Sequence, residues 1–141
     1  MKYLTCFVSL LFSLHQFVKA QETSCAKFFD GKLRTFVYTQ VEEMPEFPGG
    51  IAKFYRFISD VPLSNKNNES LQSTIFPSFV IDTTGDIKNI GIKDKLPKDY
   101  TALDRNMITL LKKCPKWIPA KCNGKNVAMR YQSRVTLCYT N

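Results

Sequence analysis

The sequence is almost without histidine, since the single one, His15, lies within the first twenty residues. These residues have the form of a secretory signal peptide: an apolar run from Tyr3 to Leu14, then small residues at Val18 and Ala20. Once residues 1–20 are cleaved off, no histidine remains. Catalysis by histidine, Ser-His and Cys-His nucleophile pairs, and metal sites that contain histidine are therefore excluded.

The apolar run is also short. It is interrupted by His15 and Gln16, before it reaches the roughly 20 residues that are needed to span a bilayer. An uncleaved membrane anchor is the alternative to a cleaved leader. Cleavage predicts an exported, soluble protein that begins at Gln21.

Acidic residues are few: 12 Asp and Glu stand against 20 Lys and Arg. Loss of Lys2 and Lys19 with the leader leaves 18 basic side chains against 12 acidic ones, a net charge of +6. The remaining length, about 120 residues, suits one domain with a single core. The basic excess suggests acidic partners, such as anionic lipid head groups, cell-wall polymers or acidic peptides, or it serves solubility alone. No aromatic-basic RNA signature is present, so nucleic acid is not expected as a partner.

Four cysteines follow the leader, separated by 88, 7 and 15 residues. These spacings fit no zinc pattern, so no metal and no cofactor are expected. An even number of cysteines in an exported protein favours disulfides. Cys114 and Cys122 bracket a connector that must reverse direction, which predicts a bond between them, with Cys25 and Cys138 paired or free. Alternatively, Cys114 is a buried thiol on a helix.

Five segments have the periodicity of secondary structure. Residues 35–41 are β-branched and aromatic, as in a short strand, and the runs on either side of residues 83–85 indicate a β-hairpin. Apolar residues at helical spacing indicate two helices, and the polar residues 64–70 indicate a loop. The two helical stripes are Ile51, Phe54, Tyr55 and Ile58, then Leu103, Met107, Leu110, Leu111 and Cys114.

The last segment alternates with period two over residues 127–139, which predicts one long strand with one face on the core. Two helices packed on one face of a three-stranded antiparallel sheet is the simplest architecture that buries all these stripes. The predicted fold class is therefore α+β. The exposed face of the long strand would carry Arg130, Gln132, Arg134, Thr136 and Cys138.

Three motifs resemble the TonB C-terminal domain family, in the form common in Bacteroidetes. They are "VEEMPEFPGG" before the first helix, "FVIDTTGDIKNIGI" in the hairpin and "LLKKCPKWIPAKCNGKNV" before the last strand. With the leader at 1–20 removed, the resemblance implies an N-terminal extension at 21–40 and a TonB C-terminal-like domain at 41–141. The motif residues are Pro45, Phe47, Pro48, Gly49, Gly50, Pro115, Trp117, Pro119 and Gly124, with Trp117 expected to anchor the core.

The resemblance implies a non-enzymatic binding module of the periplasm or cell envelope. In TonB-type proteins this domain receives a short peptide from an outer-membrane receptor, which adds as a strand beside the last strand. The partner-binding residues would here be Arg130, Gln132, Arg134 and Thr136. An ordinary solvated strand face explains the same residues, and a long free edge could instead pair with a second copy of the chain.

The sequence also departs from the family. We expect a stand-alone accessory module, since the uncleaved membrane helix and long Pro-rich spacer of a full transducer are not recognised here. The alternative function is an envelope structural protein that binds cell-wall polymer or membrane through its basic surface. An enzyme would need carboxylates such as Asp82 and Asp86, which flank the hairpin turn and are more usual there as turn formers.

Overall fold

The structure is a computed structural model that describes residues 25–62 and 71–139. The predicted leader and the loop at 64–70 lie outside these residues. Within them the fold is mixed α+β, as predicted, and no helix is long and apolar enough to cross a membrane. The elements are β1 (Lys27–Asp30), β2 (Thr35–Tyr38), α1 (Ile51–Ser59), β3 (Leu71–Ile75), β4 (Pro77–Ile81), β5 (Ile87–Ile92), the 3-10 turn η1 (Pro97–Asp99), α2 (Ala102–Leu111), β6 (Ala120–Cys122), β7 (Lys125–Val127), β8 (Met129–Gln132) and β9 (Val135–Tyr139).

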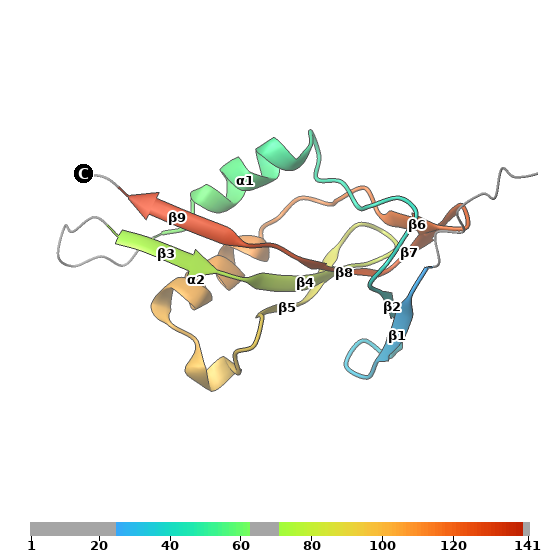
Figure 1. Ribbon diagram of the computed structural model, residues 1–141, viewed down its shortest axis with the longest axis horizontal. Helices are drawn as coiled ribbons and strands as arrows, with labels where there is room; N and C mark the ends of the chain where they lie inside the picture. The colour runs from blue at the N-terminus through green and yellow to red at the C-terminus, as the bar shows by residue number, and fades with distance from the viewer. Residues whose placement is uncertain (1–24, 63–70, 140–141) are drawn as a thin grey trace, which may run out of the picture.

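The central sheet has five strands in the order β1-β2-β8-β4-β5, and two small sheets pair β3 with β9 and β6 with β7 (Figure 1). The predicted three-stranded antiparallel sheet is therefore wrong in both the number and the direction of its strands. Residues 27–38, for the most part unassigned from the sequence, form a hairpin whose strand β2 runs parallel to β8. Strand β1 has only four residues, too few to show a periodicity.

The predicted single strand over residues 127–139 is divided into β7, β8 and β9. Strand β8 pairs antiparallel with β4, and β9 pairs antiparallel with β3. The partners Ser78↔Gln132 and Ile75↔Val135 keep the same register across the break, so β3–β4 and β9–β8 form one continuous ribbon. The break lies opposite Pro77, because proline has no N–H to donate to the neighbouring strand.

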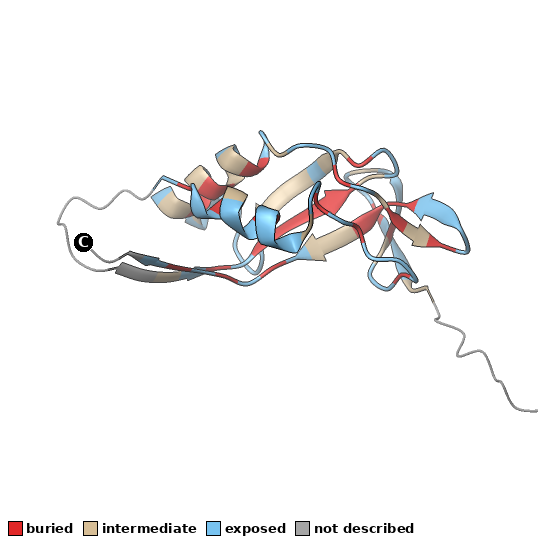
Figure 2. Ribbon diagram, turned by 90° about the horizontal axis from the view of Figure 1, so that it is seen from above, coloured by how far each residue is buried: buried red, intermediate tan, exposed pale blue. Residues whose placement is uncertain are grey.

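Both helices pack on one face of this ribbon. Phe54 and Ile58 of α1 and Met107 and Leu111 of α2 are buried with Phe79 of β4 in the main core. The other face is covered by the β1–β2 hairpin, where Val37 and Val80 are buried in a smaller cluster. Figure 2 shows the buried positions running along the central strands, with the outer turns of the helices exposed. Where the hairpin folds over it, the ribbon is therefore the middle of three layers.

The connector between α2 and β6 is held by its tryptophan. Trp117 is 3% exposed, and its ring contacts Phe54, Phe79 and Tyr131. The backbone N–H of Trp117 donates to the Gly85 carbonyl at 2.9 Å, which ties the connector to the β4–β5 turn. Gly85 has φ +86°, and a Cβ there would lie 2.0 Å from the Trp117 carbonyl oxygen. The connector and the turn therefore fit together only with glycine at this position.

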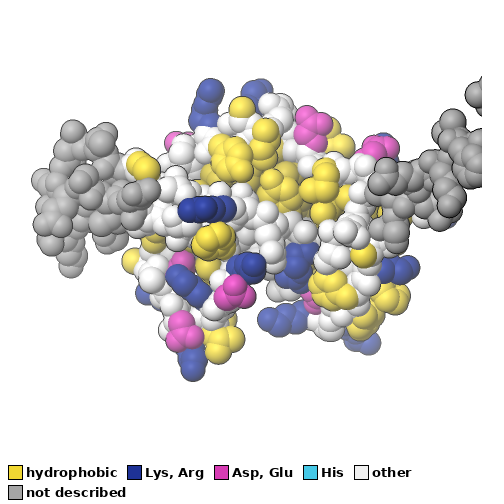
Figure 3. Space-filling model, in the orientation of Figure 1, with side chains coloured by type: hydrophobic (Ala, Val, Ile, Leu, Met, Phe, Trp, Pro, Cys, Tyr) yellow, Lys and Arg dark blue, Asp and Glu magenta, His cyan; other side chains and the backbone are white. Residues whose placement is uncertain are grey.

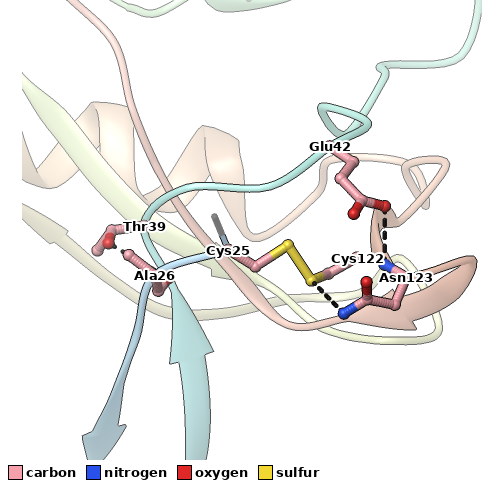
Figure 4. The surroundings of a disulfide bond; sticks show 6 residues. All are labelled: Cys25, Ala26, Thr39, Glu42, Cys122 and Asn123. Carbon is pink, nitrogen blue, oxygen red and sulfur yellow. Dashed lines mark hydrogen bonds between the residues drawn. A yellow bond between two sulfur atoms is a disulfide. The ribbon is translucent and has the colours of Figure 1, made fainter. Parts of the chain in front are cut away.

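The predicted Cys114–Cys122 disulfide is wrong, because the structure joins Cys25 to Cys122 (Figure 4). Cys114 stays a free thiol, and the Trp117 indole N–H donates to its sulfur at 3.3 Å. The connector does not fold back between Cys114 and Cys122. The connector instead runs antiparallel to the segment that precedes α1, with isolated β-bridges between Ile118 and Glu46 and between Lys121 and Glu43. Cys138 is free and exposed on β9, so the Cys25–Cys138 pair that could accompany the predicted bond is not formed either.

Candidate functional site: the open edge of β8 and β9

The candidate site is the edge of β8 and β9 that faces away from β4 and β3. The Ser133 N–H donates to the Pro77 carbonyl at 3.3 Å, so Ser133 directs its backbone toward β4. In an antiparallel pair, the residues on either side of such a hydrogen-bonded pair direct their N–H and C=O groups the opposite way. Because the register is unbroken, the backbones of Gln132, Arg134 and Thr136 face the open edge.

The N-terminal hairpin covers one end of this edge. Strand β2 meets β8 in a single parallel bridge of Tyr38 and Met129, and the Tyr38 N–H donates to the Ala128 carbonyl at 2.8 Å. Among the described residues, β9 pairs with β3 alone. From Gln132 onward, the edge is therefore open to an added strand as far as the structure describes the chain.

The side chains on this stretch are polar and exposed. Gln132 Nε2 donates to Ser78 Oγ at 3.4 Å, and the hydroxyls of Thr136 and Thr74 lie 3.4 Å apart. These contacts brace the edge against the partner strand. None of the ion pairs formed by the described residues includes Arg134. Its guanidinium can therefore meet an acidic group of an incoming segment.

Arg130 has a different role from its neighbours on the strand. Its guanidinium donates to Asp30 Oδ2 at 2.7 Å, and Asp30 is only 7% exposed. Burial alone would raise the pKa of Asp30, but the amides of Leu33 and Lys32 and the charge of Arg130 outweigh it, so the pKa lies below its usual value. Arg130 thus holds the N-terminal hairpin on the sheet, a contact with no signal in the sequence because the two residues lie 100 positions apart.

Two shallow hollows flank the open edge. One, of about 400 Å³, is lined by Met44 together with residues 129–132, and the other, of about 340 Å³, by Tyr55 and Ile58 with residues 134–137. Met44 is 59% and Tyr55 46% exposed, so apolar surface borders the polar edge. Figure 3 shows hydrophobic side chains gathered over α1 and the strip beside it. Sequence reasoning missed both residues: Tyr55 fell on the helix stripe that was expected to be buried.

The comparisons with known proteins give a match to the family model described as Gram-negative bacterial TonB protein C-terminal, over residues 66–136. The match spans half of the 141 residues. The chain belongs to this family. No curated protein and no solved structure gives a significant match. TonB C-terminal domains are non-catalytic modules that act in the periplasm in receptor-dependent transport, and the disulfide of this TonB domain suits an exported protein.

The motif residues of this TonB domain shape its frame and lie away from the open edge. Phe47 is 6% exposed and its ring lies 5.4 Å from that of Trp117. Gly49 and Gly50 have φ of +83° and +88° just before α1. Gly124, with φ +69°, completes the β6–β7 turn. Pro45, Pro48, Pro115 and Pro119 lie in the irregular segments that lead into α1 and β6.

The two carboxylates considered for an enzyme form the β4–β5 turn. Asp82 Oδ1 accepts from the amides of Thr84 and Asp86, at 2.9 and 3.0 Å. Asp86 accepts from Thr84 Oγ1 and from Lys116 Nζ, each at 3.0 Å. The Lys116 and Thr84 hydrogen bonds hold the pKa of Asp86 below its usual value, so it is charged at neutral pH. Both side chains are thus used in the turn, consistent with a non-catalytic domain.

Proposed function

We propose that this chain is an exported, stand-alone TonB-type module that binds a peptide of a TonB-dependent outer-membrane receptor by strand addition. The peptide would lie along the open edge from Gln132 to Cys138. The observation that carries the proposal is the row of outward-facing backbone groups on this stretch, continuous in register across the break. Such groups supply the main-chain hydrogen bonds of β-augmentation.

The side chains beside the edge favour a particular type of peptide. Arg134 would meet an acidic residue, and the hollow between α1 and β9 would take an apolar side chain against Tyr55 and Ile58. Alternate side chains of an added strand point to the same face, so acidic and apolar positions should alternate. Arg130 would contribute indirectly, because its ion pair with Asp30 holds the hairpin that ends the open stretch.

Binding of synthetic N-terminal segments of TonB-dependent receptors, measured by calorimetry, tests the proposal. We expect Gln132→Pro to abolish binding, since proline removes an outward N–H while leaving the donors to β4 in place. Arg134→Glu should weaken binding of acidic peptides, whereas the matched charge reversal Lys125→Glu on β7 should not. Unchanged affinity in a folded Gln132→Pro variant would overturn the proposal. A concentration-dependent dimer that this variant loses would show that the edge pairs with a second copy instead.

The domain limits belong to the same proposal: a leader at 1–20, an extension at 21–40 and the binding domain at 41–141. Intact-mass analysis of the exported protein should show a first residue of Gln21. One of these limits does not separate two folding units, because the extension is joined to the binding domain by the Cys25–Cys122 disulfide and by the pairing of β2 with β8. The extension would therefore fold as part of the domain.

A further inference from the structure

The outer face of the β1–β2 hairpin is aromatic and exposed. Phe29 and Phe36 are directly opposite each other in the register, 59% and 53% exposed, with their ring centroids 5.6 Å apart. Lys27 Nζ lies 4.9 Å from the centre of the Phe36 ring on the same face. The inner face carries Val37 and Asp30, which are buried. The alternation that buries the inner face thus leaves two phenylalanines in water, although nothing in the sheet requires aromatic residues there.

The charged side chains on the surface of this hairpin are all basic. Lys27, Lys32 and Arg34 are exposed, and the last two lie at the turn. Asp30 is the single acid of residues 27–38, and it faces inward in its ion pair with Arg130. The described surface of the hairpin is therefore cationic around the two phenylalanines. Figure 3 shows hydrophobic and basic side chains together over β1 and β2, and Figure 1 shows the hairpin projecting from the body of the molecule.

We propose that the β1–β2 hairpin is a membrane-docking element, which places Phe29 and Phe36 at the headgroup level of a bilayer with anionic lipids. Exposed aromatic rings are favoured at the boundary between headgroups and acyl chains, and basic residues beside them are attracted to anionic headgroups. A projecting hairpin can reach this boundary without burying the rest of the domain. The same hairpin of a second copy of the chain would bind poorly here, since it would place its three basic side chains against the same three basic side chains.

Docking at the hairpin leaves the peptide edge accessible. The edge begins at Gln132 on β8 and continues along β9, whereas the two phenylalanines lie on the outer face of the hairpin. The inference does not depend on receptor binding, so either can fail alone. Both would hold if the domain presented its open edge to a peptide close to a membrane surface.

Sedimentation with lipid vesicles tests the inference, with the protein recovered from an exporting Gram-negative host. We expect binding to vesicles that contain phosphatidylglycerol, weak binding to phosphatidylcholine alone, and loss of binding at high salt. Phe29→Ser with Phe36→Ser should weaken binding about tenfold or more, because the two exposed rings that the bilayer would partly bury are lost. Lys32→Gln with Arg34→Asn should weaken it about 30-fold, since each basic residue near an anionic surface contributes about fivefold.

The matched control removes two exposed basic residues from α1, Lys53→Gln with Arg56→Gln, and should leave vesicle binding unchanged. Retention of the Cys25–Cys122 disulfide and of the unfolding midpoint would show that each variant is folded. Equal binding to neutral and anionic vesicles would overturn the inference. A dimer that depends on Phe29 and Phe36 and forms without vesicle binding would overturn it too.

Discussion

The disulfide between Cys25 and Cys122 should be the largest single covalent contribution to the stability of this domain. The two cysteines are separated by 97 positions, and the loop-closure entropy removed from an unfolded chain of that length amounts to about 4–5 kcal/mol at 25 °C. Few hydrogen bonds hold the same end of the chain: the Ala26 carbonyl accepts from the Thr39 and Gln40 amides, at 2.8 and 3.3 Å. Replacement of both cysteines by serine is the perturbation of choice, because a single replacement would leave the other cysteine of the pair as a new free thiol.

Urea unfolding measures the effect. The free energy of unfolding of the Cys25→Ser, Cys122→Ser variant should fall by several kcal/mol, toward the full 4–5 kcal/mol if the hairpin and the domain unfold together. A change below about 1 kcal/mol would refute the reasoning. The matched control, Cys138→Ser, changes an exposed thiol and should leave the unfolding midpoint unchanged.

Peptide mapping without reduction checks the connectivity directly. A fragment that links Cys25 to Cys122 is expected, and a Cys114–Cys122 fragment would contradict the structure. Thiol labelling of the native protein should then modify Cys138 rapidly and Cys114 slowly. Burial raises the pKa of the Cys114 thiol, more than the Trp117 N–H lowers it, so little reactive thiolate forms there.

Two substitutions test other parts of the frame. Gly85→Ala should cost about 2–4 kcal/mol of unfolding free energy, since alanine is strained at a φ of +86° and its Cβ would overlap the Trp117 carbonyl; Gly31→Ala, with nothing within 4 Å of the new Cβ, is the control in urea unfolding. The pKa of Asp30 is lower in the folded than in the unfolded protein. Its charge therefore stabilises the fold at pH values above the unfolded pKa of about 3.9. This stabilisation is lost as the pH falls through the folded pKa. Asp30→Asn should be less stable at neutral pH by about 2 kcal/mol and should lose less stability on acidification, as followed by urea midpoints across that range.

The sequence was a good guide wherever local physics decides the structure. The helices at 51–59 and 102–111 follow the apolar spacing, and the hairpin predicted around residues 83–85 turns at Gly85, which tolerates its positive φ. Alternation over residues 127–139 also identified the outward side chains of residues 132–138, whereas Ala128 and Arg130 on the same face are covered by the N-terminal hairpin. That prediction survives the division of the strand, because the register continues past the break.

The long-range contacts were not accessible in the same way. The pairing of β2 with β8, the Asp30–Arg130 ion pair and the Cys25–Cys122 bond each join segments about 90 to 100 positions apart. Four cysteines can pair in three ways. The short spacing between Cys114 and Cys122 favoured a bond between them, but a short spacing does not show whether the chain turns back between the two residues. What decided the pairing is the extended path of the connector, along which its first cysteine points to the core and its last to the N-terminal segment.

The edge of β8 and β9 makes a prediction that is specific to single amide groups. In the free protein, the Ser133 N–H donates to the Pro77 carbonyl. Every second residue of a strand faces the same neighbour, so the Val135 and Leu137 amides face β3. These three amides should exchange slowly with deuterium. The amides of Gln132 and Thr136 face outward and should exchange fast. NMR detection of amide exchange separates the two sets within one strand.

A receptor peptide that adds as a strand should slow the exchange of the outward-facing amides alone. The amides of Gln132, Arg134 and Thr136 should become protected on binding, while those of Ser133 and Val135 change little because they are already bonded. Protection should not extend toward β2, since the Tyr38–Met129 bridge already occupies that end of the edge. Equal protection of odd and even positions would indicate general stabilisation of the fold. Protection confined to α1 would place the peptide on the helix, and either result would contradict strand addition.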